Sequence, residues 1–228
     1  MKRILFSLVA VMAFSAFAKA QNLQVHYDFG DERKQITTTL EMFKPDKYGS
    51  TFFFVDMDYS NDTRGIDNGV SLAYWEIARS FKWNENQKFE PRVEFNSGNF
   101  KLNDPLPFTV IENAWLVGGQ YTFNNADFSK VLTIQANYKY IKDKEDASFQ
   151  LTAVWGLHFM DRKLSFTGFA DFWKEEMIWD TDYRFLMEPQ IWYNASKNFS
   201  FGSEIEMSNN FVKDEFVVNP TLAVKWTF

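Results

Sequence analysis

The chain has 228 residues, no cysteine and a formal net charge of −6. Such an acidic chain lacks the positive surface that nucleic-acid binding needs, and without cysteine no disulfide framework holds it together. Aromatic residues make up 19% of the sequence although the mean hydropathy is negative, and no stretch after residue 20 approaches the length of a membrane-spanning helix.

The first 20 residues have the features of a secretory signal peptide. Lys2 and Arg3 give a positive start, residues 4–18 form an apolar run, and Ala18-Lys19-Ala20 is a small-x-small cleavage site. The run is too short to cross a membrane as a helix. We therefore expect residues 1–20 to be removed. Residues 21–228 would then form one domain with a formal charge of −9, since three basic residues lie in the removed segment.

From residue 21 onward, apolar and polar side chains alternate in about twelve short stretches. A strand points successive side chains to opposite faces, so each stretch has one apolar and one polar face. In chain order the stretches are residues 23–29, 35–42, 52–59, 70–83, 89–95, 115–122, 132–140, 149–159, 164–172, 183–194, 199–208 and 219–228. The least regular is 70–83, in which we expect Tyr74 and Glu76 to lie on the polar face. The most regular is the last, which ends on Phe228.

The connections between these stretches differ in length in a regular way. Tight turns at 161–163 and 196–198 follow even-numbered stretches, whereas longer segments at 60–68, 98–111 and 174–181 follow odd-numbered ones. This is the arrangement of an outer-membrane barrel with short periplasmic turns and longer outer loops. Three prolines lie within the predicted strands. Each would mark a strand end or a bulge, because proline cannot donate a backbone hydrogen bond to the neighbouring strand. They are Pro91, Pro189 and Pro220.

Together these features predict an all-β fold, a transmembrane antiparallel up-and-down β-barrel of about 12 strands in the bacterial outer membrane. Its apolar face would contact the lipid bilayer. The terminal strand ending on Phe228 resembles the assembly signal of outer-membrane barrels, which implies recognition by the barrel assembly machinery. A soluble barrel or sandwich has the same alternation and is the competing fold.

In the barrel model the polar faces line the lumen, where acids outnumber bases by eleven to four. The inward carboxylates would be Asp28, Glu41, Asp56, Asp58, Glu76, Glu90, Glu94, Asp171, Glu188, Glu204 and Glu206, and the inward cations Arg92, Lys139, Arg184 and Lys225. Some of these charges would pair, notably Arg92 with its neighbouring glutamates and Arg184 with Glu188. An open pore of this composition would disfavour anions. The alternative is a lumen plugged by its own side chains.

One predicted strand interleaves aromatic and acidic residues on its inward side. Phe52 and Phe54 precede Asp56 and Asp58, and a later strand repeats the pairing. The residues of that repeat are Phe169 and Asp171. Aromatic rings can stack a planar base, and carboxylates accept hydrogen bonds from sugar hydroxyls or an exocyclic amine. Nucleobases and sugars are therefore both candidate ligands, with packing of the lumen as the alternative role.

The same region resembles a known family. Thr39-Leu40-Glu41-Met42-Phe43, Tyr48-Gly49 and Phe53-Phe54-Val55-Asp56 are similar to the second and third strands of the Tsx-like nucleoside-specific channels. The resemblance covers residues 35–58. It implies a twelve-stranded outer-membrane barrel with a narrow pore for nucleosides, in which Phe52, Phe54 and Asp56 lie among the channel-lining residues. We include Glu41, an inward residue of the same motif, among the candidate substrate-binding residues.

The sequence does not indicate an enzyme. Lipid hydrolysis by a barrel needs a nucleophile and a base on the outer face, usually serine with histidine. The two histidines, His26 and His158, are both expected to face the lumen, and neither has a metal-ligand spacing. We expect no metal and no cofactor. The predicted function is passive diffusion of small solutes, with a non-conducting structural barrel as the alternative.

Overall fold

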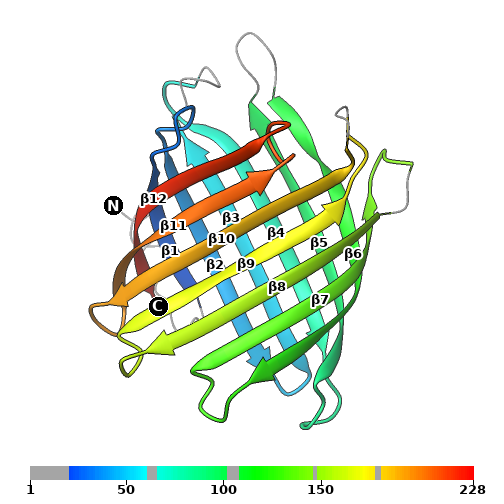
Figure 1. Cartoon of the computed structure of the whole chain (residues 1–228), viewed down its shortest axis with the longest axis vertical. Helices are drawn as coiled ribbons and strands as arrows, with labels where there is room; N and C mark the ends of the chain where they lie inside the picture. Colours follow the sequence, from blue (N-terminus) through cyan, green and yellow to red (C-terminus); the bar gives the residue numbers. More distant parts are fainter. Residues whose placement is uncertain (1–20, 61–65, 102–107, 146–147, 178–180) are drawn as a thin grey trace, which may run out of the picture.

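Twelve antiparallel strands form one closed barrel, in which each strand pairs with its neighbours in sequence and β1 also pairs with β12 (Figure 1). The strands are β1 (Gln21–Asp28), β2 (Ile36–Asp46), β3 (Gly49–Tyr59), β4 (Val70–Phe81), β5 (Phe89–Lys101), β6 (Phe108–Asn124), β7 (Lys130–Ile141), β8 (Ser148–Phe159), β9 (Leu164–Lys174), β10 (Tyr183–Asn194), β11 (Phe199–Asn209) and β12 (Phe216–Thr227). This confirms the predicted up-and-down barrel.

The computed structural model describes residues 21–60, 66–101, 108–145, 148–177 and 181–228. The predicted signal peptide lies outside the described residues and stays a prediction. In the described part of the chain, no helix is long and apolar enough to span a bilayer.

The barrel wall exposes apolar side chains and buries polar ones. Among the described residues, seven buried side chains are apolar, whereas 26 are polar or charged. On β4 the expected alternation holds, since Ile77 is 51% exposed and its neighbour Ala78 is 2% exposed. A soluble barrel would bury its apolar face. The inverted pattern fits hydrocarbon around the outside and a polar interior, as in an outer-membrane barrel.

The two ends of the barrel differ in their connections. Residues 47–48, 82–88, 125–129, 160–163 and 195–198 connect strands at one end, which we call the short-turn end, and both chain termini of the barrel lie there. Six connections lie at the other end, the long-loop end, at residues 29–35, 60–69, 102–107, 142–147, 175–182 and 210–215. The tight turns at 161–163 and 196–198 are confirmed at the short-turn end.

The predicted loop at 98–111 is shorter than expected. A register shift between Asn96 and Gly98 lets β5 and β6 continue pairing, with Gly98 opposite Ile111 and Lys101 opposite Phe108. A bulge of this kind changes the register without ending the strand. The connection is therefore reduced to residues 102–107, and these residues, which include Pro105 and Pro107, lie outside the described part of the chain.

The prediction that proline marks a strand end or a bulge is wrong for Pro189, which lies in the middle of β10 with the same register on both sides of it. It pairs with Gly168 on the neighbouring strand β9. Gly168 has a φ of 148°, which glycine adopts readily and which is strained for other residues. On the other side, the pairing of β10 with β11 stops at Met187 and resumes at Gln190. The proline is thus accommodated by a break in one ladder and by glycine on the opposite strand. Pro91, the third residue of β5, does lie near a strand end.

Gly168→Ala is expected to lower the free energy of unfolding by about 2–3 kcal/mol, because a strained φ and a close contact combine. A Cβ on residue 168 would lie 2.4 Å from the carbonyl oxygen of Glu188. Gly156 is the matched control, since its nearest neighbour would be His158 Nε2 at 3.7 Å. Unfolding by urea in vesicles measures both. An equal loss in the two alanine variants would contradict this account.

Candidate functional site

An aromatic ladder lines the lumen on β3 and β4. The ring centroids of Phe52 and Phe54 are 5.9 Å apart, and those of Phe54 and Tyr74 are 5.8 Å apart. All three side chains lie at inward positions because the strands alternate strictly here. All three are partly accessible, so the ladder presents ring surface to the lumen. Such rings can stack a flat or apolar part of a solute.

Three carboxylates from opposite sides of the barrel face one another in the lumen. We call Asp56 on β3, Glu188 on β10 and Glu204 on β11 the acidic cluster. Glu188 interacts electrostatically with both of the others. Thr39 Oγ1 donates to Asp56 at 2.5 Å and Gln190 Nε2 donates to Glu204 at 2.5 Å, while Glu188 has no hydrogen-bond partner among the described residues. Oxygens of this cluster are therefore available to a donor-bearing or cationic solute.

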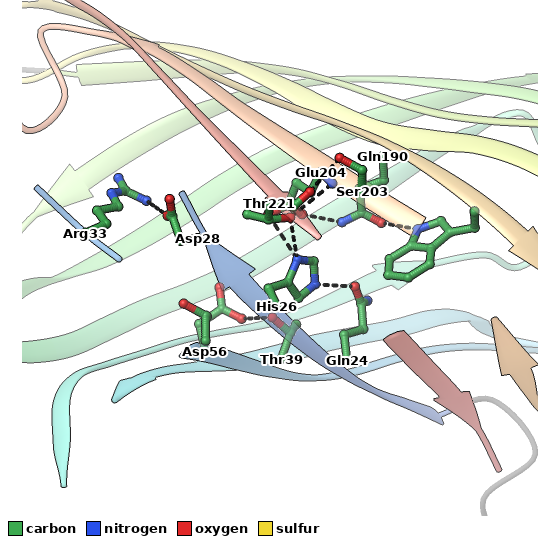
Figure 2. Close-up of polar contacts among 12 residues, drawn as sticks. Gln24, His26, Asp28, Arg33, Thr39, Asp56, Gln190, Ser203, Glu204 and Thr221 are labelled. Atoms are coloured by element: carbon green, nitrogen blue, oxygen red, sulfur yellow. Dashed lines mark hydrogen bonds and ion pairs between the residues drawn. The ribbon is translucent and has the colours of Figure 1, made fainter. Parts of the chain in front are cut away.

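Figure 2 shows how two members of the acidic cluster, Asp56 and Glu204, are placed around His26. Asp56 with Thr39 lies on one side of the imidazole, and Glu204 with Gln190 lies on the other. His26 is itself held by Thr221 at 3.1 Å and Gln24 at 3.0 Å. The imidazole of His26 is thus fixed by hydrogen bonds to other residues of the barrel wall.

Arg33 neutralises two further lumen acids, which the sequence analysis did not anticipate. It lies in the connection between β1 and β2, and its guanidinium donates to Glu206 at 2.6 Å and to Asp28 at 3.2 Å. Asp58 also interacts electrostatically with Arg33. A lone arginine in a short connection that also contains acids gave no signal that it would turn inward. This paired group lies near the long-loop end and adjoins the acidic cluster, since Glu188 interacts electrostatically with both Glu206 and Arg33.

A second acidic group lies between β4, β5 and β9. Tyr74 Oη donates to Glu76 at 2.7 Å and Asn96 Nδ2 donates to the same oxygen at 3.1 Å. Glu76 interacts electrostatically with Glu94 and with Asp171, which lies on the far wall. Arg92 forms the predicted ion pair with Glu94. Carboxylates therefore face the lumen from both walls at this level as well.

The predicted pairing of Arg184 with Glu188 is wrong. Arg184 Nη1 binds Glu175 at 2.5 Å, and its other nitrogens donate to the carbonyl oxygens of Asn210 and Phe211 at 3.0 and 2.5 Å. The guanidinium also lies 5.0 Å from the ring of Trp173. Arg184 is near the start of β10, so it reaches the long-loop end instead of the middle of the lumen. This leaves Glu188 without the expected partner.

The Arg184 ion pair is expected to make stability depend on pH. Burial alone would raise the pKa of Glu175, but Arg184, Trp173 and Lys139 together hold that pKa below its ordinary 4.5. A depressed folded-state pKa adds stability above pH 4.5 that is lost as the pH falls through the lower folded value. We expect Arg184→Gln to cost about 3 kcal/mol at pH 7, because it leaves a largely buried carboxylate without its ion-pair partner and with only the hydrogen bond from Trp173 Nε1.

Urea unfolding between pH 3 and 7 checks this prediction. Glu175→Gln should remove part of the pH dependence seen in the wild type. The control is Lys213→Gln, since Lys213 pairs with Glu32 in an exposed bridge of 2.7 Å that should contribute less than about 1 kcal/mol. A larger loss for Lys213→Gln than for Arg184→Gln would refute the assignment.

Large side chains fill the lumen near the short-turn end. Trp192 is 0% exposed, with Lys225 Nζ 3.8 Å above its ring and Gln190 Oε1 accepting from its Nε1 at 2.8 Å. Gln24, near the start of β1, is 1% exposed. We call Trp192, Lys225 and Gln24 the inner plug. The inner plug therefore occupies part of the lumen near the short-turn end.

The polar groups around the second histidine do not form a hydrolytic triad. His158 Nδ1 lies 2.9 Å from Ser165 Oγ, and Asn194 Nδ2 donates to the same oxygen at 3.0 Å. Catalysis would need the histidine between the serine and the orienting group, whereas here the serine lies between the other two. Among the described residues, no group of three or more metal-ligating side chains is placed to hold an ion.

The structure divides the predicted site residues among distinct places. Phe52, Phe54 and Asp56 lie together on β3, as expected from the strand pattern. Glu41 pairs in register with Phe54 and accepts from Asn22 at 2.9 Å, and Phe169 pairs in register with Glu188 on the neighbouring strand, so both lie beside this group. Asp58 accepts from Thr37 at 2.7 Å, and Asp171 accepts from Thr152 in the second acidic group. Tyr74, Glu188 and Glu204 had been placed on the inward faces, but they had not been assigned to the site.

Solved structures of outer-membrane barrels share this fold at low sequence identity. The KdgM porin is 12% identical with a TM-score of 0.54, and the match covers 92% of this chain and 99% of that one. The Salmonella typhi outer membrane phospholipase (OMPLA), solved as a dimer with bound calcium, is 10% identical with a TM-score of 0.56, covering 91% and 90%. The Escherichia coli outer membrane phospholipase A is 11% identical with a TM-score of 0.54, covering 91% and 96%.

These similarities establish the fold alone, because a porin and a phospholipase share it. The fold and the apolar outer surface agree with the predicted location in the bacterial outer membrane. No curated protein matches the sequence. A family model described as "Domain of unknown function (DUF5020)" matches residues 20–228, and the chain therefore belongs to the DUF5020 family.

Proposed function

We propose that this protein is a passive channel of the bacterial outer membrane for small neutral or cationic solutes, with nucleosides as the preferred class. The observation that carries the proposal is the aromatic ladder of Phe52, Phe54 and Tyr74 beside the acidic cluster. A nucleoside has both a flat ring and hydroxyl donors. Its base would stack on the ladder, and its hydroxyl or amino groups would donate to Asp56 or Glu188.

The excess of carboxylates argues against acidic solutes. One solved structure with this fold is described as the KdgM porin in complex with disordered oligogalacturonate. A chain of negatively charged sugars would meet unpaired Glu188 and the rest of the acidic cluster in this lumen, which is unfavourable. The shared fold therefore does not transfer that ligand to this chain.

Single-channel recording of the refolded protein in a planar bilayer tests the proposal. Adenosine should reduce the current at concentrations at which a neutral sugar has no effect. An open current that neither solute changes would leave a general cation-preferring pore. The absence of current from a folded barrel would refute transport.

The inner plug favours a second candidate, a non-conducting barrel with a structural role. Trp192 is fully buried, and Lys225 Nζ lies 3.8 Å from its ring on the lumen side of the wall. In a sealed barrel, Phe54→Ala with Asp56→Asn would change only stability. In a channel, the same pair of substitutions should weaken block by adenosine.

Two further parts of the proposal concern partners and chemistry. The strand that ends at Phe228 is proposed to be recognised by the barrel assembly machinery, and assembly of a Phe228→Ser variant in vesicles with and without that machinery would test this. The arrangement of His158, Ser165 and Asn194 supports a protein that is not a hydrolase. Phospholipid turnover by the refolded protein would contradict that assignment.

A further inference from the structure

The two ends of the barrel carry opposite charge. At the short-turn end the connections contain six basic residues against three acidic ones: Lys47, Lys82, Lys88, Arg162, Lys163 and Lys197. The described residues of the long-loop connections contain ten acidic residues against five basic ones. A chain that is acidic as a whole thus concentrates its positive charge at one rim.

The basic rim extends onto the lipid-facing side of the wall. Lys44 on β2 and Lys130 on β7 lie on the same outward faces as Leu40 and Leu132, and both lysines are exposed. Lys44, Lys130, Lys163 and Lys197 form no ion pair with any described residue. Their ammonium groups are therefore available to an external anion.

Exposed aromatic residues accompany these lysines. Trp83 is 74% exposed, Tyr48 is 61% exposed, and Lys47 Nζ lies 4.6 Å from the ring of Tyr48. Aromatic side chains of this kind lie at the level of lipid headgroups in membrane proteins. Lysines at the same level would lie next to lipid phosphates, where each gains from a negative surface potential.

We propose that the short-turn end binds anionic phospholipid headgroups of the adjoining leaflet through this rim of lysines. The long-loop end, with its excess of acids, would not do so. The proposal depends on the barrel lying in a bilayer and not on conduction, so it stands or falls separately from the channel.

Quenching of tryptophan fluorescence tests the proposal directly. The refolded protein is placed in vesicles that contain brominated phosphatidylglycerol or brominated phosphatidylcholine, and the relative binding of the two lipids is measured. At low salt the wild type should prefer phosphatidylglycerol by about threefold or more, and 1 M NaCl should abolish the preference because it screens the charges.

Two matched variants locate the binding. Replacing Lys44, Lys130, Lys163 and Lys197 by Gln should reduce the preference to about one, since four charges at the headgroup level are lost. Replacing Lys34, Lys142, Lys144 and Lys213 by Gln removes the same charge from the long-loop end and should leave the preference intact. The proposal is overturned by a wild type without preference, by a rim variant that keeps it, or by loss only in the long-loop variant. The salt titration needs no substitution, so it tests the proposal even where a variant does not fold.

Discussion

Replacing the acidic cluster, with Asp56→Asn, Glu188→Gln and Glu204→Gln combined, should lower the permeability of the pore to K⁺ relative to Cl⁻ by about fivefold or more. A cation that passes about 4 Å from one carboxylate gains about 1 kcal/mol in a water-like medium, and more where the lumen is less polar. Glu188 has no hydrogen-bond partner among the described residues, although it interacts electrostatically with Arg33. Reversal potentials in a KCl gradient measure the ratio.

The control removes three carboxylates that lie outside the lumen. Glu85, Glu145 and Asp161 are exposed residues of the connections, so replacing them changes the net charge equally without touching the pore. Their loss should change the ratio by much less than twofold, because exposed charges are screened in physiological salt. Equal effects of the two triple variants would show that the selectivity comes from the surface and not from the acidic cluster.

Trp192→Ala should both destabilise the barrel and widen its narrow end. The buried indole fills the space between Lys225 and the wall, so truncation should cost about 3–5 kcal/mol of unfolding free energy. The cavity would adjoin polar groups, including Gln190 and His26, and would fill with water. A barrel whose path is limited by the inner plug should then show a clear rise in single-channel conductance.

Trp226→Ala is the matched control. Trp226 lies near the end of β12 on the lipid-facing side and is 49% exposed, so its loss leaves the lumen unchanged. It should therefore leave conductance unaltered. If Trp192→Ala lowers stability without changing conductance, the inner plug is a packing feature and the constriction lies elsewhere.

The strand pattern was sufficient to predict the barrel and the inward residues, but not the contacts inside it. Alternation assigned Asp56 and Glu188 to the lumen because side-chain direction depends only on parity within a strand. Whether two inward side chains come into contact depends on how far the strands are shifted along one another. The alternation within a single strand carries no information on that shift. The pairing of Arg184 with Glu188 was therefore predicted from closeness in sequence, and the structure pairs Arg184 with Glu175 instead.

Two further features could not be predicted from the alternation of apolar and polar residues: the position of Pro189 within a strand and the inward direction of Arg33. Pro189 looked like a strand end, since nothing near it in sequence revealed that Gly168 would lie opposite. The sequence around Arg33 resembles that of an ordinary loop. Its side chain turns into the barrel because Glu206, from a distant strand, provides an ion-pair partner inside. In each case the missing information was the neighbour from a distant part of the chain.

Closure of the barrel by β1 and β12 has a consequence for the order of assembly. The pairing of Asn22 with Thr227 joins the two ends of the barrel sequence, so this seam cannot form before the last strand has been made. Contacts so distant in sequence form slowly, and until then two unpaired edges remain open to aggregation. Each chain must therefore be kept apart from its copies during the interval between synthesis and closure.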